Sequence, residues 1–297
     1  RAVDCVYETV GSRDGYLIVP YSDDIDDQYQ YFNGSSWSGE LDVTTILDSY
    51  VVQSRRTDDG KVLTVYFDDV NDRYDFTYWN GTAWLQLGND IDGEGGGDAS
   101  GHSVSMNAAG DRVAIGALGN DGNGSSSGHV RIYEWNGTAW VQLGADIDGE
   151  AAGDEFGTSV SLSADGTILA VGAPDNDDNG NNAGHVRVFQ YSANSWMQIG
   201  QDIDGESVGD ESGYSLSLNG LGNRIAIGSY LNSDNATESG HVRVFYFDTN
   251  AWNQIGNDID GGARGESSGR SVSLSADGMT VAIGASSGAF GGGRGDL

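Results

Sequence analysis

The sequence is poor in cysteine and proline, with one cysteine and two prolines among 297 residues. A single cysteine, Cys5, excludes an internal disulfide, so the fold cannot depend on cross-links within the chain. No run of 18 apolar residues is present, which excludes a membrane-spanning helix and predicts no membrane insertion. Because the chain starts at Arg1 without the apolar core of a signal peptide, we expect a processed or truncated product.

Basic residues are also scarce, at 14 Lys and Arg against 45 Asp and Glu, so the formal net charge is −31 at pH 7. Such a surface repels nucleic acid and anionic membranes, and we expect neither as a partner. It attracts cations. Calcium-loaded extracellular proteins and proteins of salty environments both have this composition, and the sequence leaves the two alternatives open.

Glycine is abundant, with 47 residues, and it does not follow the three-residue period of collagen. It clusters in short patches between β-like runs, as turns require. Apolar residues make up 37% of the chain and aromatic residues 10%. This apolar content is sufficient for a core and argues against a disordered chain.

An internal repeat organises the chain. Four tryptophans follow one another at intervals of 56 residues, and a degenerate copy surrounds Trp37. The repeated segments are AWLQLGNDIDGE at Trp84, AWVQLGADIDGE at Trp140, SWMQIGQDIDGE at Trp196 and AWNQIGNDIDGG at Trp252. A fixed period of this length is typical of repeat architectures.

Each repeat contains four short runs of alternating apolar and polar residues, which predict strands. In one copy these runs are residues 159–163, 168–173, 185–191 and 195–203. Asp-Gly and Asn-Gly pairs between the runs suit tight hairpin turns, because they tolerate positive φ. Four antiparallel strands that repeat in this way predict the blades of a β-propeller.

We therefore expect an all-β fold, a single β-propeller domain over residues 1–297. Six blades are our first expectation and seven our second, while a linear solenoid of sheets is the alternative. In the last blade the third strand should begin near Leu297, so this blade is expected to be incomplete. The predicted blades are 5–43, 50–92, 103–148, 159–204, 215–260 and a partial blade at 271–297.

The stretch FGTSVSLSADG from Phe156, continued by Val171-Gly172-Ala173-Pro174 and GHVRVF, resembles the FG-GAP repeat. That repeat builds the propeller of integrin α-subunits and of many surface proteins, and the resemblance extends over roughly residues 95–290. It implies cell adhesion and bound calcium. The family often carries an Asp-x-Asp-x-Asp-Gly loop between the first and second strands, but here residues 164–166 read only Ala-Asp-Gly. The family's usual calcium site therefore cannot be carried over.

The connections of such a blade leave by two opposite faces. Residues 146–157 (DIDGEAAGDEFG) connect one blade to the next, and residues 174–185 (PDNDDNGNNAGH) connect a second strand to a third. Both kinds of connection belong to one face, whereas the hairpin turns belong to the other. The sequence therefore predicts one acidic face and one face of tight turns.

Calcium prefers six to eight oxygen ligands, and two sets of residues on the acidic face could supply some of them. Asp175, Asp177 and Asn179 match the first half of an EF-hand loop, although Val186 occupies the position of the closing glutamate. The second set recurs three times and consists of Asp146, Asp148, Glu150 and Asp154. The alternative for both sets is solvated turns in which Asp side chains cap nearby amides.

Histidine and arginine recur two residues apart in three repeats, as His129 with Arg131, His185 with Arg187 and His241 with Arg243. Identical positions on separate blades cannot converge on one catalytic site. We expect these residues to form hydrogen bonds between blades or to pair with the repeated Asp. The repeated tryptophans are expected to pack between blades near the outer edge, with sugar binding as the alternative.

Five Asn-x-Ser/Thr sequons fall in predicted loops or turns, where glycosylation requires them to lie. They indicate a glycoprotein that is secreted or displayed at the cell surface. The acceptor residues are Asn33, Asn80, Asn123, Asn136 and Asn235.

No nucleotide-binding loop or nucleophile elbow occurs in a suitable context, and the inner strands are expected to present serine to the channel. We therefore expect a non-catalytic binding or adhesion propeller, with a protein or glycan of the cell surface or matrix as partner. One alternative is a structural subunit of an extracellular filament or matrix that contacts identical chains. A propeller glycosidase or lyase is the other, with carboxylates such as Asp68, Asp69 and Asp72 in the divergent first blades.

Overall fold

The computed structural model describes residues 85–286 continuously, together with the backbone of residue 84 and of segments 3–7, 16–20, 28–31, 41–42, 49–56, 62–68, 73–79 and 294–296. These residues form strands and turns and include no helix. Accordingly, no helix in the described part of the chain is long and apolar enough to cross a membrane. The prediction of an all-β fold is confirmed.

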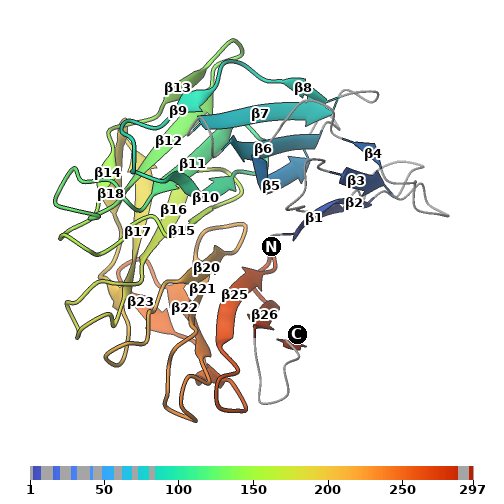
Figure 1. Ribbon diagram of the computed structural model, residues 1–297. Helices are drawn as coiled ribbons and strands as arrows, with labels where there is room; N and C mark the ends of the chain where they lie inside the picture. Colours follow the sequence, from blue (N-terminus) through green and yellow to red (C-terminus); the bar gives the residue numbers. More distant parts are fainter. Residues whose placement is uncertain are drawn as a thin grey trace.

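Six antiparallel sheets follow one another along the chain around a common centre (Figure 1). Within each sheet the strand order follows the chain from the centre to the rim. The innermost strands of successive sheets pack against one another. This arrangement is the predicted propeller of four-stranded blades and replaces the linear solenoid that the repeat alone allowed.

The strands of the first sheet are β1 (Val3–Tyr7), β2 (Tyr16–Pro20), β3 (Gln28–Tyr31) and β4 (Leu41–Asp42). Those of the second are β5 (Ser49–Arg56), β6 (Val62–Asp68), β7 (Arg73–Trp79), β8 (Trp84–Gln86) and β9 (Ile91–Asp92). Those of the third are β10 (Ser100–Met106), β11 (Arg112–Ala117), β12 (His129–Trp135), β13 (Trp140–Gln142) and β14 (Ile147–Asp148).

The fourth sheet contains β15 (Ser159–Leu162), β16 (Ile168–Ala173), β17 (His185–Ser192), β18 (Ser195–Gln198) and β19 (Ile203–Asp204). The fifth contains β20 (Ser215–Leu218), β21 (Arg224–Ser229), β22 (His241–Phe247), β23 (Trp252–Gln254) and β24 (Ile259–Asp260). The sixth contains β25 (Ser268–Leu274), β26 (Val281–Ala285) and β27 (Arg294–Asp296).

The outermost strand of each complete repeat is interrupted, which differs from the single run predicted for residues 195–203. The chain pairs with β17 first through β18 and again through the two-residue strand β19. Between them Gly200 adopts a φ of 75°, a conformation that glycine reaches without strain. A short irregular segment at this glycine therefore divides the strand, and a glycine recurs at the same place in the other copies.

The third strand of the last sheet begins three residues earlier than the repeat predicts. Ala285 of β26 pairs with Arg294, just as Ala173 of β16 pairs with His185. The connection between β26 and β27 is thus shorter than the equivalent connection in the fourth sheet. The residues Arg294, Gly295 and Asp296 consequently form this third strand, β27.

The hydrophobic cores lie between neighbouring sheets. Because successive strand residues point to opposite faces, each sheet contributes to two cores. Leu169 and Val171 of β16 pack with residues of the third sheet, whereas Ile168 and Ala170 of the same strand pack with residues of the fifth. A blade is therefore stabilised through its neighbours, as expected of a repeat protein.

Serine side chains of the inner strands join each blade to the next. Ser103 Oγ donates a hydrogen bond of 2.6 Å to the Gly157 carbonyl, and Ser105 Oγ accepts one of 2.9 Å from the Leu162 amide. The same pair of bonds recurs at the next two junctions, from Ser159 and Ser161 and from Ser215 and Ser217. The serines predicted to face the channel are thus engaged in contacts between blades.

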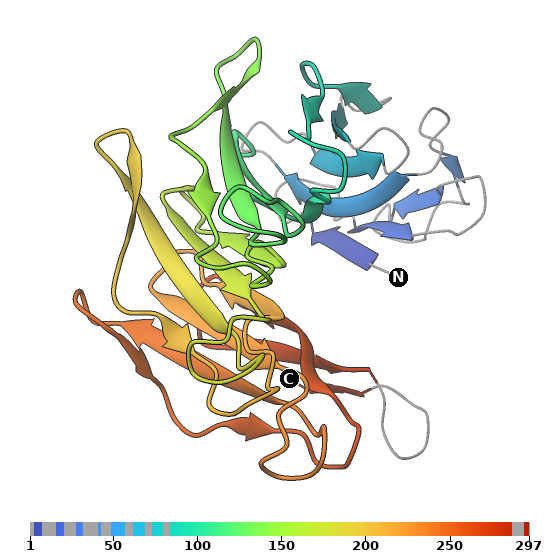
Figure 2. The ribbon, with the colours of Figure 1, turned by 60° about the vertical axis from the view of Figure 1, so that its left-hand side comes forward.

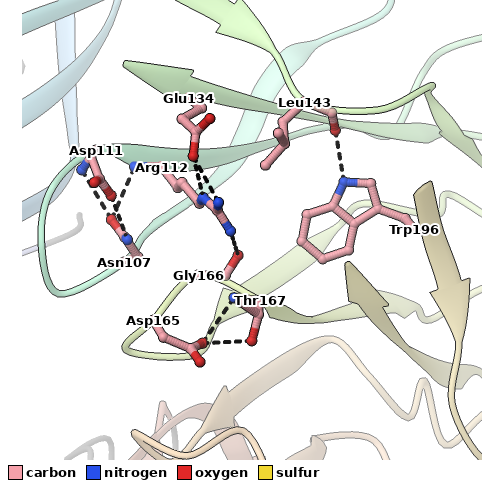
Figure 3. A network of polar contacts seen from close by, with 9 residues as sticks. All are labelled: Asn107, Asp111, Arg112, Glu134, Leu143, Asp165, Gly166, Thr167 and Trp196. Carbon is pink, nitrogen blue, oxygen red and sulfur yellow. Dashed lines mark hydrogen bonds and ion pairs between the residues drawn. The ribbon is translucent and has the colours of Figure 1, made fainter. Parts of the chain in front are cut away.

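The three repeated tryptophans whose side chains are described also join blades, as predicted (Figure 3). Trp196 Nε1 donates to the Leu143 carbonyl of the preceding sheet at 2.8 Å. On the same side of the molecule, Arg112 pairs with Glu134 at 2.7 Å and donates to the Gly166 carbonyl of the following sheet at 3.1 Å. Trp140 and Trp252 form the equivalent bonds to Leu87 and Ile199. These indole groups are therefore structural, as their repeated positions indicated.

Candidate functional site

Two kinds of long connection lie together on one face of the propeller, which we call the loop face. It consists of the connections 118–128, 174–184 and 230–240 within sheets, and 149–158 and 205–214 between sheets. The Gly153 amide donates to the Ser125 carbonyl, and the Glu155 amide to the Ser126 carbonyl, which ties a connection of each kind together. In Figure 2 the β12–β13 turn (green) projects upward and the β17–β18 (gold) and β22–β23 (orange) turns project to the left, away from these loops. The predicted division into an acidic face and a face of turns is confirmed.

The first predicted calcium set is held within its own loop. Asp175 accepts a hydrogen bond from the Asn182 side chain, and Asp177 accepts one from the Asn182 amide, each at 2.8 Å. Asn179 instead directs its Nδ2 to the Gly205 carbonyl, at 2.6 Å. The two carboxylates therefore cap the loop, while the amide joins it to the connection between the fourth and fifth sheets.

The second predicted set is distributed over different surroundings. Asp154 is 3% exposed and accepts bonds from the Ala151 amide and from Asn176, each at 3.1 Å. The Asp148 carbonyl accepts a bond of 2.7 Å from Arg187, and Glu150 lies 3.4 Å from the same guanidinium. Asp146 accepts a bond from Gln142. The structure therefore does not bring these four residues into one site.

The family's calcium position is a closed turn in this chain. Asp165, between β15 and β16, accepts hydrogen bonds from the Ser163 hydroxyl and from the amide and hydroxyl of Thr167. Burial acts to raise the pKa of this carboxyl, but the three bonds outweigh burial and lower the pKa. One carboxylate enclosed in this way does not fit the oxygen-rich coordination of calcium.

Clusters that the sequence did not reveal lie at three blade junctions. At two of the junctions a glutamate of the interblade connection, a histidine at the start of a third strand and an aspartate just before the last outer-strand segment approach one another. In the junction between the third and fourth sheets these are Glu150, His185 and Asp202, whose nitrogen or oxygen atoms all lie within 4.8 Å of one another. The equivalent group contains Glu94, His129 and Asp146. His241 instead belongs to two groups, one with Glu206 and Asp234 and the other with Asp258 and Asp260.

The histidines of these junctions are buried, and burial favours their neutral form. His185 is 1% exposed and His241 is 0% exposed, and both ring nitrogens of each have no hydrogen-bond partner. Burial lowers the pKa of His185, and Arg187 lowers it further, against the opposing effect of Asp202 and Glu150. The same causes lower the pKa of His129 and of His241. Neutral rings keep a lone pair available.

Each arginine of the repeat holds two blades together, as predicted. Arg187 donates to the Asp148 carbonyl of the preceding sheet, and its guanidinium lies over the Phe156 ring at 4.3 Å. Arg131 and Arg243 donate to the Asp92 and Asp204 carbonyls in the same way. The histidines do not share this role, because His185 and His241 form no such bond between blades.

A shallow cleft of about 290 Å³ opens on the loop face between the connections 205–214 and 230–240. Val208 at its edge is 69% exposed. The cleft combines this apolar surface with hydroxyl and carboxylate groups. Its lining residues are Ser207, Val208, Gly209, Asp210, Leu231, Ser233, Asp234, Thr237 and Glu238.

The sequons differ in how their acceptor nitrogens are used. Asn123 Nδ2 donates to the Gly149 and Glu150 carbonyls, and Asn235 Nδ2 donates to the Gly261 carbonyl, the same role that Asn179 has. The side chain of Asn136, in the β12–β13 turn, uses only its Oδ1 atom in hydrogen bonds among the described residues, which leaves Nδ2 without such a bond. Asn33, Asn80, Asp69 and Asp72 lie outside the described residues, and only the backbone of Asp68 is described.

Comparison with known proteins supports the fold and the repeat. The chain has a TM-score of 0.60 with a protein described as a candidate 6-phosphogluconolactonase of Bacteroides uniformis, at 11% identity, covering 98% of this chain and 83% of that one. It has a TM-score of 0.54 with Aleuria aurantia lectin in complex with Fucα1-6GlcNAc, at 10% identity, covering 99% and 90%. A TM-score of 0.54 is also found with an acylaminoacyl peptidase of Pyrococcus horikoshii, at 10% identity, covering 96% and 42%. These likenesses show a shared fold.

At the level of sequence, residues 146–189 match the FG-GAP repeat. The predicted resemblance is therefore confirmed for this segment, which spans the junction between the third and fourth sheets. No curated protein shows significant sequence similarity to the chain.

Proposed function

We propose that this protein is an extracellular, non-catalytic binding propeller that contacts its ligand through the cleft of the loop face. The observation that supports this proposal is the contrast between the junctions and the loop tips. The inner-strand serines and the junction arginines are engaged between blades. The loop tips are instead exposed and differ between copies, as at Gly96, Ala152 and Val208. Surfaces that vary on a constant scaffold are typical of binding.

A glycan or a protein segment fits this cleft. The lectin with the same fold binds a fucosylated sugar, which supports a glycan as one ligand, and the FG-GAP repeat supports adhesion at a cell surface. The carboxylates of Asp210, Asp234 and Glu238 in the cleft lining favour neutral or basic ligands over sialylated or sulfated ones. The acidic loops as a whole remain a predicted calcium-binding surface.

The proposal is tested by binding to an array of neutral and sialylated glycans and of Lys-rich peptides. We expect a neutral glycan or a Lys-rich peptide to bind, and Val208→Arg to weaken that binding at least tenfold, because a large cation then occupies the cleft. Leu221→Arg is the matched control, since Leu221 is 76% exposed in the β20–β21 turn, on the other face.

Binding that both variants weaken equally would contradict a site in this cleft, and binding of only sialylated glycans would contradict the role of its charge. Light scattering on the same preparation distinguishes the alternative of a structural subunit, which predicts large assemblies instead of monomers.

An extracellular setting predicts a particular pattern of glycosylation. In chain secreted from eukaryotic cells we expect a glycan at Asn136 and little at Asn123 or Asn235. A glycan replaces one Nδ2 hydrogen and would disturb the bonds of Asn123 and Asn235 to carbonyls, so molecules modified there should fold and be exported less well. Mass spectrometry of peptides released with and without glycosidase measures the occupancy. Unmodified Asn136 in secreted chain would argue against the pattern.

A further inference from the structure

The Glu–His–Asp clusters are chemically unlike the other acidic groups of the loop face. Each contains a buried histidine, and the nitrogens of His185 and His241 have no hydrogen-bond partner. A buried polar group without a partner is costly and calls for a physical explanation. We propose that each of the three junctions binds a divalent transition-metal ion of the zinc type, which ties the interblade connection to the next blade.

The charge around each histidine suits a divalent cation. The carboxylates of Asp202, Glu150 and Asp154 act on His185, together with the guanidinium of Arg187. Asp204 interacts with the same ring. Negative charges therefore outnumber the positive charge around the ring. A divalent cation reduces this surplus, and a neutral imidazole is the form that coordinates it.

The distances are close to those of a coordination sphere. Nδ1 of His129 lies 3.9 Å from Glu94, and Nδ1 of His241 lies 4.0 Å from Glu206. Bonds of about 2 Å to a common tetrahedral centre require about 3.3 Å between ligand atoms. The glutamate side chains are 38–47% exposed and can rotate to close this difference, whereas the buried histidines stay fixed.

The junction between the fifth and sixth sheets indicates that the cluster residues occur as a set. The segment Asp204-Gly205-Glu206 corresponds to Asp260-Gly261-Gly262 before the sixth sheet, so no glutamate is present at that position. In that sheet Arg294 occupies the register position of the histidine, opposite Ala285. Where the glutamate is absent, the histidine is absent too, and a permanently cationic residue takes its place in the sequence.

The ligand types select the ion. Imidazole nitrogen with carboxylate oxygen suits zinc and its neighbours in the transition series, whereas calcium and magnesium require oxygen ligands. The proposed ions therefore differ in chemistry from the calcium predicted for the acidic loops, and they would use Asp146 and Glu150 of that predicted set as ligands beside a histidine. Their role is structural, because the interblade glutamates Glu94, Glu150 and Glu206 each approach a histidine that belongs to the following sheet.

The test uses the full chain stripped with EDTA and dialysed against zinc in the presence of excess calcium and magnesium. We expect three zinc ions per chain by elemental analysis, and a melting temperature that zinc raises, since an ion that binds the folded chain stabilises it. Cobalt in place of zinc should give the visible absorption of coordinated nitrogen and oxygen. Retention of no zinc, or displacement of all zinc by calcium, would overturn the proposal.

Matched variants assign the sites. His185→Gln should reduce the stoichiometry from three to two, whereas His102→Gln should leave it at three, because the exposed His102 belongs to none of the clusters. Glu150→Gln changes an exposed side chain and serves as the second variant if the buried substitution prevents folding. It should weaken zinc binding at one site. Unchanged zinc binding in a folded His185→Gln or Glu150→Gln chain would show that zinc binds elsewhere.

Discussion

Replacing Gly205 by alanine is expected to reduce the free energy of unfolding by about 3 kcal/mol, at the upper end of what overpacking of a closely packed site costs. A Cβ atom at this position would overlap the Ala183 carbonyl oxygen, and the Gly184 carbonyl oxygen lies 3.1 Å away. Both obstacles are backbone atoms of the neighbouring connection. They cannot rotate aside as a side chain would, so the two connections have to move apart.

The cost of this substitution is steric rather than conformational. Gly205 is not among the glycines with positive φ, and its amide donates to the Gly184 carbonyl at 2.7 Å. The repeated Asp-Ile-Asp-Gly segment therefore ends in glycine because two connections cross there at backbone distance. Gly149 and Gly261 meet the Ser127 and Ser239 carbonyls in the same way.

Urea unfolding followed by tryptophan fluorescence measures the effect. Gly96→Ala is the matched control, since a Cβ there meets nothing within 4 Å and its φ is ordinary. We expect this control to change the free energy of unfolding by less than about 0.5 kcal/mol. Equal stability of the two variants would contradict the close crossing of the connections.

Replacing Phe156 by alanine is expected to cost about 3–5 kcal/mol, as for other fully buried aromatic residues. Phe156 is 0% exposed, its ring meets Phe189 edge-on at 6.3 Å, and the Arg187 guanidinium lies over it. The substitution leaves a cavity in the core between the third and fourth sheets and removes the aromatic face on which the arginine rests.

Ser212 provides the internal control, because it occupies the same place at the next junction. It is also 0% exposed, but its side chain has only a long contact of 3.5 Å with Arg243. We expect Ser212→Ala to cost about 1 kcal/mol or less. The comparison uses the midpoint and slope of urea unfolding, and similar losses for the two variants would show that Phe156 does not support this junction.

The fold was predictable because its signals are local. The 56-residue spacing of the tryptophans, the alternation within each run and the Asp-Gly and Asn-Gly turns each specify structure within one repeat. The interruption of the outer strand at Gly200 was missed although a glycine recurs there, since alternation alone continues through it. The position of β27 was missed because the connection before it departs from the repeat.

The junctions were less predictable because their partners belong to different repeats. Glu150 and His185 lie 35 residues apart, and only the pairing of His185 with Asp204 across β17 and β19 brings the outer strand alongside the histidine. The sequence showed that each residue type recurs. It did not show that a glutamate of one repeat meets a histidine of the next, because this requires the packing of two sheets.

The serine bonds between inner strands have a consequence for how such a chain can change. Ser103 belongs to one repeat and its acceptor, Gly157, to the next, so no single blade contains a whole junction. If a complete blade were exchanged for a blade of an unrelated propeller, the serine hydrogen bonds at both of its junctions would therefore lose a donor or an acceptor. Duplication of 56 residues within the array keeps every donor with an acceptor, wherever the cut falls. The unit that can be duplicated is thus any stretch of 56 residues, whether or not it begins at the boundary of a blade.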